Sequence, residues 1–223
     1  MAKTILTPTQ FKVLELLAQE KRITSTFYLT GGTALSEFYL QHRLSEDLDL
    51  FTEIAEVEPK VVESFLKKIS PQLEINKIKR TQFLGLISYL LMFENGLELK
   101  VDFNYYPFPR INKGKKFQNL EIDSLYDIAV NKVHTLFMRP RPRDYIDLFF
   151  ILKKERGNYS LKKLILDAKA KFDWDIDRIT LASQFLRSLD LKMEGPKMLV
   201  PFDLKEIREF FLQEAKNLKD EIF

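Results

Sequence analysis

A chain of 223 residues is long enough for one large domain or two small ones, with a core that needs no crosslinks. Cysteine is absent, which excludes disulfides and thiolate metal sites, so a metal would bind oxygen atoms or the two histidines. The 35 basic and 32 acidic residues nearly balance, and a net charge of +3 argues only weakly for nucleic-acid binding. No apolar run is long enough to cross a bilayer and no signal-peptide cleavage site follows the first one, so we expect a soluble, cytoplasmic protein that does not associate with membranes.

The periodicity of apolar residues predicts sheet-forming elements in the first half of the chain. In chain order we expect a helix at 8–19, a strand at 27–30, a helix at 33–42, a strand at 47–51, a helix at 58–69, and strands at 83–93 and 97–105. The last two strands are joined by Glu94, Asn95 and Gly96, a sequence typical of a hairpin turn.

The second half is predicted to be helical. Helices are expected near 124–138, 144–154, 160–172, 177–189 and 203–219. Residues 111–123 are expected to form a linker, and the domain boundary is placed after residue 115. The fold class is therefore α+β: a core of mixed sheet and helices at 1–115, then a helical domain at 116–223 that we expect to complete the active site.

Basic residues cluster at 77–80, 113–116 and 139–143. Each cluster could contact phosphates, but a run of charge is more often a solvated surface. We adopt the solvated-surface interpretation for the first two clusters.

An acidic pair carries the first sign of chemistry. Asp47 and Asp49 alternate with Leu48 and Leu50, so both carboxylates are expected on one side of a strand whose other side is in the core. An Asp-x-Asp pair alone is weak evidence, since it also occurs on solvated edge strands. Here it follows a glycine turn that opens a helix, where backbone N–H groups favour an anion such as a triphosphate. Two aspartates beside such a turn can hold the Mg²⁺ that bridges to a nucleotide.

Asp102 is a candidate third carboxylate. It alternates with Val101 and Phe103, which places it on the polar face of its strand together with Glu98 and Lys100. On the residues alone, an active-site role and simple exposure to solvent are equally supported.

Lys132 interrupts the apolar stripe of the helix expected at 124–138. A lysine in a buried stripe needs carboxylates or phosphates as partners, or must reach water. Asp147, on the apolar side of the next helix, is a possible partner for Lys132 or Arg143, whereas Asp144 is better placed to cap that helix. His134 lies away from the stripe and is expected to be exposed or capping.

Together these segments resemble the AbiEii/AbiGii toxin family of nucleotidyltransferases. The resemblance is carried by Tyr28–Leu35 with its Gly-Gly-Thr turn, by His42–Phe51 with Asp-Leu-Asp, by Val101–Phe103, by Lys132 and by Arg143–Leu148. It covers roughly the first two-thirds of the chain. It implies a polymerase β-like nucleotidyltransferase core followed by helices, and a toxin paired with a separately encoded antitoxin. Some members transfer nucleotides to tRNA acceptor ends.

The resemblance also implies roles for particular residues. Nucleotide binding would fall to Gly31, Gly32, Thr33, Arg43, Ser45 and Lys132; the metal to Asp47, Asp49 and Asp102; and catalysis to Asp49, Asp102, Lys132 and Asp147. The family varies at the third carboxylate, so a one-metal arrangement without Asp102 stays open.

The resulting expectation is an Mg²⁺-dependent enzyme that transfers NMP from an NTP to a hydroxyl of an RNA, such as a tRNA 3′ end, or of a protein, and releases pyrophosphate. Two alternatives remain. One is a catalytically silent module that binds nucleotide or antitoxin. The other is a different Mg²⁺ enzyme that uses its Asp-x-Asp pair to hold a nucleotide-sugar diphosphate.

Overall fold

The computed structural model describes residues 4–192 and 196–220. The chain divides into an N-terminal unit, Met1–Ser124, and a C-terminal unit, Leu125–Phe223. None of the helices in these described ranges is long and apolar enough to span a membrane.

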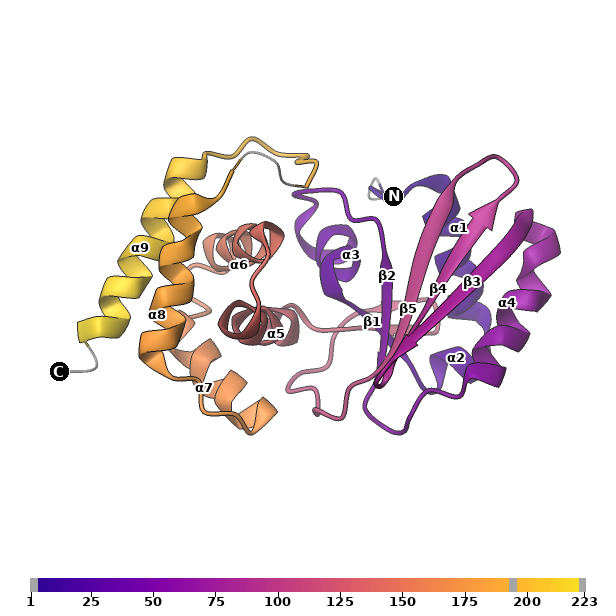
Figure 1. The fold of residues 1–223 in the computed structure, drawn as a ribbon, viewed down its shortest axis with the longest axis horizontal. Helices are drawn as coiled ribbons and strands as arrows, with labels where there is room; N and C mark the ends of the chain where they lie inside the picture. Colours follow the sequence, from indigo (N-terminus) through magenta and orange to yellow (C-terminus); the bar gives the residue numbers. More distant parts are fainter. Residues whose placement is uncertain (1–3, 193–195, 221–223) are drawn as a thin grey trace. The chain divides into compact units, whose positions relative to one another are not determined.

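The N-terminal unit is built on a sheet (Figure 1). Its elements are α1 (Pro8–Gln19), α2 (Lys21–Thr24), β1 (Tyr28–Thr30), α3 (Gly31–Leu35) with a π-helical turn (Ser36–Leu40), β2 (Leu48–Thr52), α4 (Pro59–Leu73), β3 (Ile75–Phe83), β4 (Leu86–Phe93), β5 (Glu98–Tyr105), β6 (Lys116–Phe117) and β7 (Leu120–Ile122). The strand order is β3-β4-β5-β2-β1-β7-β6. Strand β2 is parallel to β5 and antiparallel to β1, and β1 is parallel to β7, so the sheet is mixed as predicted.

One face of this sheet is packed into the core. Ile87, Tyr89 and Leu91 of β4 and Val101 and Phe103 of β5 are buried and point to this face. The same core contains the apolar side of α4, formed by Val62, Phe65, Leu66 and Ile69. Since side chains alternate along a strand, Asp102 and its neighbours on β4 and β2 lie on the opposite face of the sheet.

Several predicted elements are confirmed. Helix α1 has the expected bounds, and the Thr7 side chain accepts a hydrogen bond from the backbone N–H of Gln10 while the Gln10 side chain accepts one from the backbone N–H of Thr7, which completes a capping box. The hairpin turn after β4 contains Gly96 at φ +80°, a backbone conformation that glycine adopts without strain.

Strand β3 is not predicted by the sequence, and its character explains why. It is an edge strand whose nine residues are exposed or half-exposed, so no alternation of apolar and polar residues marks it. The prediction of a linker at 111–123 is also wrong where β6 and β7 pair, because Leu120 and Ile122 are buried in the sheet. The N-terminal unit ends at Ser124, whereas the sequence predicts a boundary after residue 115.

The C-terminal unit is helical, as predicted. It contains α5 (Leu125–Met138), α6 (Pro142–Lys154), α7 (Leu161–Phe172), α8 (Arg178–Leu186), a 3-10 turn (Arg187–Asp190) and α9 (Leu204–Asp220). Aromatic rings of α6, α8 and α9 form part of its core, with ring centroids of Tyr145 and Phe211 5.2 Å apart and those of Phe185 and Phe211 5.3 Å apart.

Candidate functional site

The sheet brings two of the predicted carboxylates into neighbouring positions. Asp49 on β2 is the register partner of Asp102 on β5, and on its other side Asp49 is the register partner of Thr30, the residue before Gly31. Register partners on adjacent strands place their side chains on one face, about 5 Å apart. The glycine turn, Asp49 and Asp102 therefore form one row across the middle of the sheet.

Lys100 is not among the predicted functional residues, and it links the acidic ones. Its ammonium Nζ lies 2.8 Å from Oδ2 of Asp102 and 3.2 Å from Oδ2 of Asp47. Burial alone would lower the pKa of Lys100, but its hydrogen bond to Asp102 and the charges of Asp102 and Asp47 outweigh burial, so the pKa is raised. Lys100 is thus a resident cation among the carboxylates.

Asp102 is buried, with a residue exposure of only 6%, so the alternative of a merely solvated carboxylate is wrong. Its Oδ2 binds Lys100, whereas its Oδ1 is buried without a hydrogen-bond partner among the described residues. A buried carboxylate oxygen without a donor is costly unless a cation or a ligand proton reaches it. Oδ1 of Asp102 is therefore the atom of this site that most clearly calls for a bound cation or ligand.

Gly31 allows the chain to pass directly against Asp49. Its φ of +72° is a left-handed conformation, and a Cβ placed on Gly31 would collide with Oδ2 of Asp49 and lie 3.0 Å from its Cγ. Only glycine combines this backbone conformation with this approach. The close contact between the glycine turn and Asp49 therefore depends on glycine at position 31.

Gly32 has a similar relationship with two other predicted residues. A Cβ on Gly32 would lie 2.6 Å from Nη2 of Arg43 and 2.9 Å from Oγ of Ser45. Arg43 is almost fully buried, with 2% of its surface exposed, and donates a 2.9 Å hydrogen bond to the carbonyl of Leu44. The structure thus gathers the predicted residues Gly32, Arg43 and Ser45 at the start of α3.

Two further contacts hold the segment that carries the acidic residues. The hydroxyl of Thr33 donates a hydrogen bond to the backbone carbonyl of Asp47, so Thr33 positions the acidic strand from the helix side. Gln10 of α1, which sequence reasoning did not single out, donates through Nε2 to the carbonyls of Ser45 and Glu46 at 2.8 Å and 2.9 Å. Nothing in the sequence distinguishes Gln10 beyond its capping position, because its partners are backbone atoms.

The fit to Mg²⁺ can be judged from these donors. Carboxylate oxygens are the ligands that Mg²⁺ prefers, and the unpartnered Oδ1 of Asp102 is such a ligand. Within the described residues, however, no three acidic, histidine or cysteine side chains are grouped so as to hold a metal as they stand. The ammonium of Lys100 lies where a cation would join Asp47 to Asp102, so the donors fit a metal that takes over the ion pairs of Lys100.

The C-terminal unit contains a second group of predicted residues. Nζ of Lys132 lies 2.7 Å from Oδ1 of Asp144 and 2.7 Å from Oδ2 of Asp147, which confirms the predicted contact with Asp147. Asp144 also accepts a hydrogen bond from the N–H of Arg141 and so caps α6 as expected. Burial opposes the charge of Lys132, but the two carboxylates together raise its pKa.

His134, predicted to be exposed or capping, is half-exposed and packs against another helix. Its ring stacks on Phe172 of α7 with centroids 3.9 Å apart and an angle of 20° between the planes. Burial lowers the pKa of His134. The helical wheel of α5 could not show this, because the partner ring comes from another helix.

Comparisons with known proteins agree with this arrangement. The chain is 31% identical over 198 residues to the uncharacterized protein aq_aa25 of Aquifex aeolicus (strain VF5), an alignment that covers 87% of this chain and 89% of the relative. Among solved structures it is similar to JHP933 from Helicobacter pylori, with a TM-score of 0.61 and 22% identity over 97% of this chain and 94% of that one. A second H. pylori structure, described as that of a nucleotidyltransferase, has a TM-score of 0.62 at 22% identity and covers 97% of both chains.

These structures share the polymerase β-like nucleotidyltransferase fold, which confirms the predicted fold class. The family model described as nucleotidyl transferase AbiEii toxin, type IV toxin–antitoxin system, matches residues 15–221. That range includes the glycine turn, the three aspartates, Lys132 and Asp147, and it extends over the last third of the chain, which the sequence motifs left unassigned. The chain therefore belongs to the AbiEii nucleotidyltransferase toxin family.

Proposed function

We propose that this protein transfers NMP from an NTP to a hydroxyl at the end of an RNA, with Mg²⁺ as its metal and pyrophosphate as the second product. One observation carries the proposal. The glycine turn is in direct steric contact with Asp49, which is paired in register with the buried carboxylate of Asp102. A turn that can receive phosphates and carboxylates that can hold a divalent cation are what nucleotidyl transfer requires.

Each predicted site residue of the N-terminal unit has a role in this proposal. Gly31 and Gly32 let the backbone that opens α3 pass close to Asp49, Arg43 and Ser45, and its N–H groups would bind phosphate oxygens beside the positive charge of the Arg43 guanidinium. Ser45 and Thr33 contribute hydroxyls near the same turn. Asp47, Asp49 and Asp102 would hold Mg²⁺, which when bound neutralises phosphate charge and orients the nucleotide.

Asp102 has a second role in the proposal. Its Oδ1 has no hydrogen-bond partner among the described residues, so it can accept the proton of the acceptor hydroxyl as that oxygen attacks the α-phosphorus. The bond from the α-phosphorus to the bridging oxygen then breaks, and pyrophosphate leaves. The catalytic contribution of the protein is chiefly positioning and charge neutralisation.

The roles of Lys132 and Asp147 stay predictions that rest on the family. We propose that Lys132 binds nucleotide phosphates and that Asp147, 2.7 Å from Nζ, holds its ammonium in place. We also propose, on family membership alone, that the chain acts as the toxin of a toxin–antitoxin pair with a separately encoded antitoxin protein.

The decisive experiment measures transfer of label from each α-³²P NTP to total RNA with Mg²⁺, for the unaltered protein and for Asp49→Asn. Loss of a metal-holding carboxylate should reduce transfer by roughly 10²-fold or more, by analogy with the loss of a transition-state-stabilising group. Glu94→Gln, an exposed residue at the hairpin turn, is the matched control and should keep full transfer. Transfer that survives Asp49→Asn would refute the proposal. Mg²⁺-dependent NTP binding without transfer to any acceptor would instead indicate a silent module.

A further inference from the structure

The face of the sheet that carries Asp102 continues outward over β4 and β3. Ser88 on β4 is the register partner of Asp102, and Thr81 on β3 is the register partner of Ser88. The row that begins with Asp49 therefore reads Asp49, Asp102, Ser88, Thr81: two carboxylates followed by two hydroxyls. With about 4.8 Å between strands, the whole row extends roughly 14 Å from Asp49 to Thr81 at the edge of the sheet.

The rows on either side of it have a different character. On one side, Lys100 is paired with Leu90, and Leu90 with Lys79. On the other side, Asn104 is paired with Leu86, and Leu86 with Phe83. The hydroxyl row thus lies between a row that carries two lysines and a row that ends in an aromatic ring.

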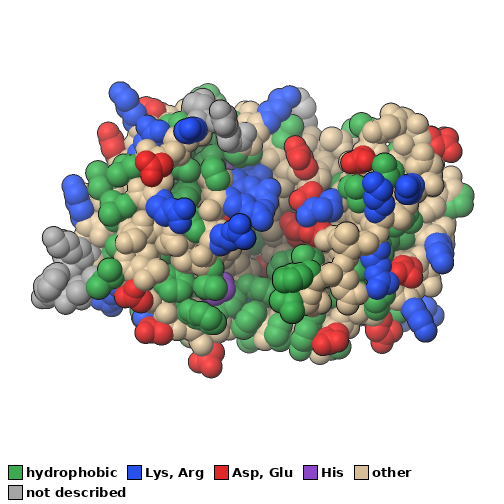
Figure 2. Space-filling view, in the orientation of Figure 1, with side chains coloured by type: hydrophobic (Ala, Val, Ile, Leu, Met, Phe, Trp, Pro, Cys, Tyr) green, Lys and Arg blue, Asp and Glu red, His purple; other side chains and the backbone are tan. Residues whose placement is uncertain are grey.

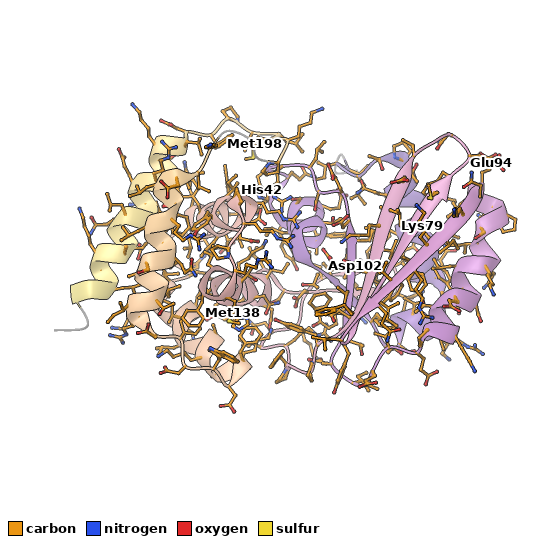
Figure 3. All side chains as sticks on the ribbon, in the orientation of Figure 1. His42, Lys79, Glu94, Asp102, Met138 and Met198 are labelled. Carbon is orange, nitrogen blue, oxygen red and sulfur yellow. The ribbon has the colours of Figure 1, made fainter. Side chains whose placement is uncertain are left out.

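The outer part of this face is open to solvent. Lys77, Lys79 and Thr81 are exposed and Ser88 is half-exposed, while Phe83 is 75% exposed and Leu84 at the turn is 83% exposed. Figure 2 shows acidic side chains next to basic ones over the sheet of the N-terminal unit, and Figure 3 labels Asp102 and Lys79 on this same sheet. Phe83 and Leu84 thus place exposed apolar side chains at the end of β3, on the same strand as the exposed lysines.

Arg80 shows which charges belong to the other face. It alternates with Lys79 and Thr81, and its guanidinium makes a 2.8 Å ion pair with Glu63 of α4. Lys77 and Lys79 therefore project from the face opposite to α4, the face of Asp102. A charged edge strand by itself serves to prevent strand pairing between molecules, but that purpose requires neither an aromatic ring nor continuity with Asp49 and Asp102.

We infer that this surface, defined by Lys77, Lys79, Thr81, Phe83 and Ser88, binds the single-stranded 3′-terminal segment of the RNA acceptor. The inference rests on the proposed function and adds the surface of the N-terminal unit on which the unpaired RNA end would lie. Lysine ammoniums complement the phosphates, the Phe83 ring stacks on an unpaired base, and the row of Thr81 and Ser88 leads the terminal hydroxyl to Asp102. A duplex buries its bases and cannot use the ring of Phe83 in this way.

The test measures binding of a fluorescein-labelled single-stranded RNA oligonucleotide by anisotropy, without NTP or divalent metal. Lys77→Ala/Lys79→Ala should weaken binding about tenfold at low salt. It should also reduce the slope of log K against log salt by roughly 1.4, because each phosphate that a lysine neutralises accounts for about 0.7 of that slope. Phe83→Ala should weaken binding about tenfold, because the base no longer has a ring on which to stack. A hairpin RNA without an unpaired end should bind the unaltered protein more weakly than the single strand.

The matched control is Lys60→Ala/Lys67→Ala, which removes the same charge from exposed positions on α4. It should keep the affinity and the salt slope of the unaltered protein. Equal losses in both double variants would mean that only net charge matters and would overturn the inference. The inference would also be overturned if Phe83→Ala and Lys77→Ala/Lys79→Ala each bound RNA as well as the unaltered protein does. It would likewise be overturned if the unaltered protein bound no RNA and labelled a protein acceptor. Because binding is read without nucleotide, these outcomes are distinct from failure of the transfer experiment.

Discussion

The carboxylate of Asp102 accepts a 2.8 Å hydrogen bond from the ammonium of Lys100, which lies two residues earlier on the same strand. The same ammonium is 3.2 Å from Asp47, so it joins two residues assigned to one metal. A cation that neutralises the site from within must be displaced before a divalent ion binds the same oxygens. In the proposed Mg²⁺-dependent reaction, Lys100 would therefore lower the affinity for the metal while holding the carboxylates of Asp47 and Asp102 together before the metal binds.

Lys100→Met should raise the affinity for Mn²⁺ or Mg²⁺. Lys100 is 39% exposed and its charge is screened by solvent, so the expected gain is on the order of 1 kcal/mol, or about fivefold. Isothermal titration calorimetry with Mn²⁺ measures it directly. Lys79→Met removes the same charge from an exposed position and should leave the affinity unchanged. Weaker metal binding by Lys100→Met would show that the lysine supports the metal rather than competing with it.

Gly31→Ala should impair transfer far more than it impairs folding. The new Cβ meets the carboxylate of Asp49, and the φ of +72° adds roughly 1 kcal/mol of backbone strain. Gly96→Ala is the matched control, since Gly96 has a φ of +80° and nothing within 4 Å of the added Cβ. The two variants should lose similar stability in urea, and only Gly31→Ala should lose transfer. Equal transfer by both would mean that the closeness of Gly31 and Asp49 has no catalytic consequence.

Lys132→Met should destabilise the C-terminal unit. It removes an ammonium that lies 2.7 Å from the buried carboxylates of Asp144 and Asp147, and breaking a buried ion pair typically costs about 3–5 kcal/mol. Lys153→Met breaks an exposed pair with Glu206 and should cost less than about 1 kcal/mol. Thermal unfolding compares the two. Stabilisation of the unaltered protein by ATP, absent from a folded Lys132→Arg variant, would support the phosphate-binding role separately from the structural one.

The protein should lose stability on acidification through His134. Burial lowers its pKa in the folded state, so the unfolded chain, with an ordinary value of about 6.5, binds the proton more readily. The stability contributed by the neutral ring is present above pH 6.5 and is lost as the pH falls below that value. His134→Phe keeps a ring against Phe172 and cannot titrate, so its free energy of unfolding should change less between pH 7.5 and 5. Parallel pH profiles for the two proteins would contradict this assignment.

The sequence predicts those parts of the site that follow from the alternation of apolar and polar residues along a single strand. Asp49 and Asp102 could each be placed on the polar face of a strand, because their apolar neighbours Leu48, Leu50, Val101 and Phe103 define the other face. That the two strands are adjacent and parallel is a tertiary fact, and within the N-terminal unit only the resemblance to a family could indicate it.

Lys100 and β3 show what alternation cannot predict. Lys100 shares a strand face with Asp102, which is visible in the sequence, but its contact with Asp47 depends on how β2 and β5 are aligned. Strand β3 has no buried residue and no regular alternation of apolar and polar residues, so its pairing with β4 is specified by the partner strand and the turn more than by its own composition.

The order of strands in the sheet has a consequence for how the chain folds during its synthesis. Strands β3, β4 and β5 pair with their sequence neighbours, whereas β2 must wait for β5, with α4 and two strands between them in the chain. Non-local parallel pairing is slow compared with hairpin closure. During synthesis, Asp49 therefore has no partner carboxylate until Asp102 has left the ribosome and β5 has docked beside β2. A chain arrested before that point can fold a hairpin, but it lacks the paired carboxylates on which the proposed transfer to RNA depends.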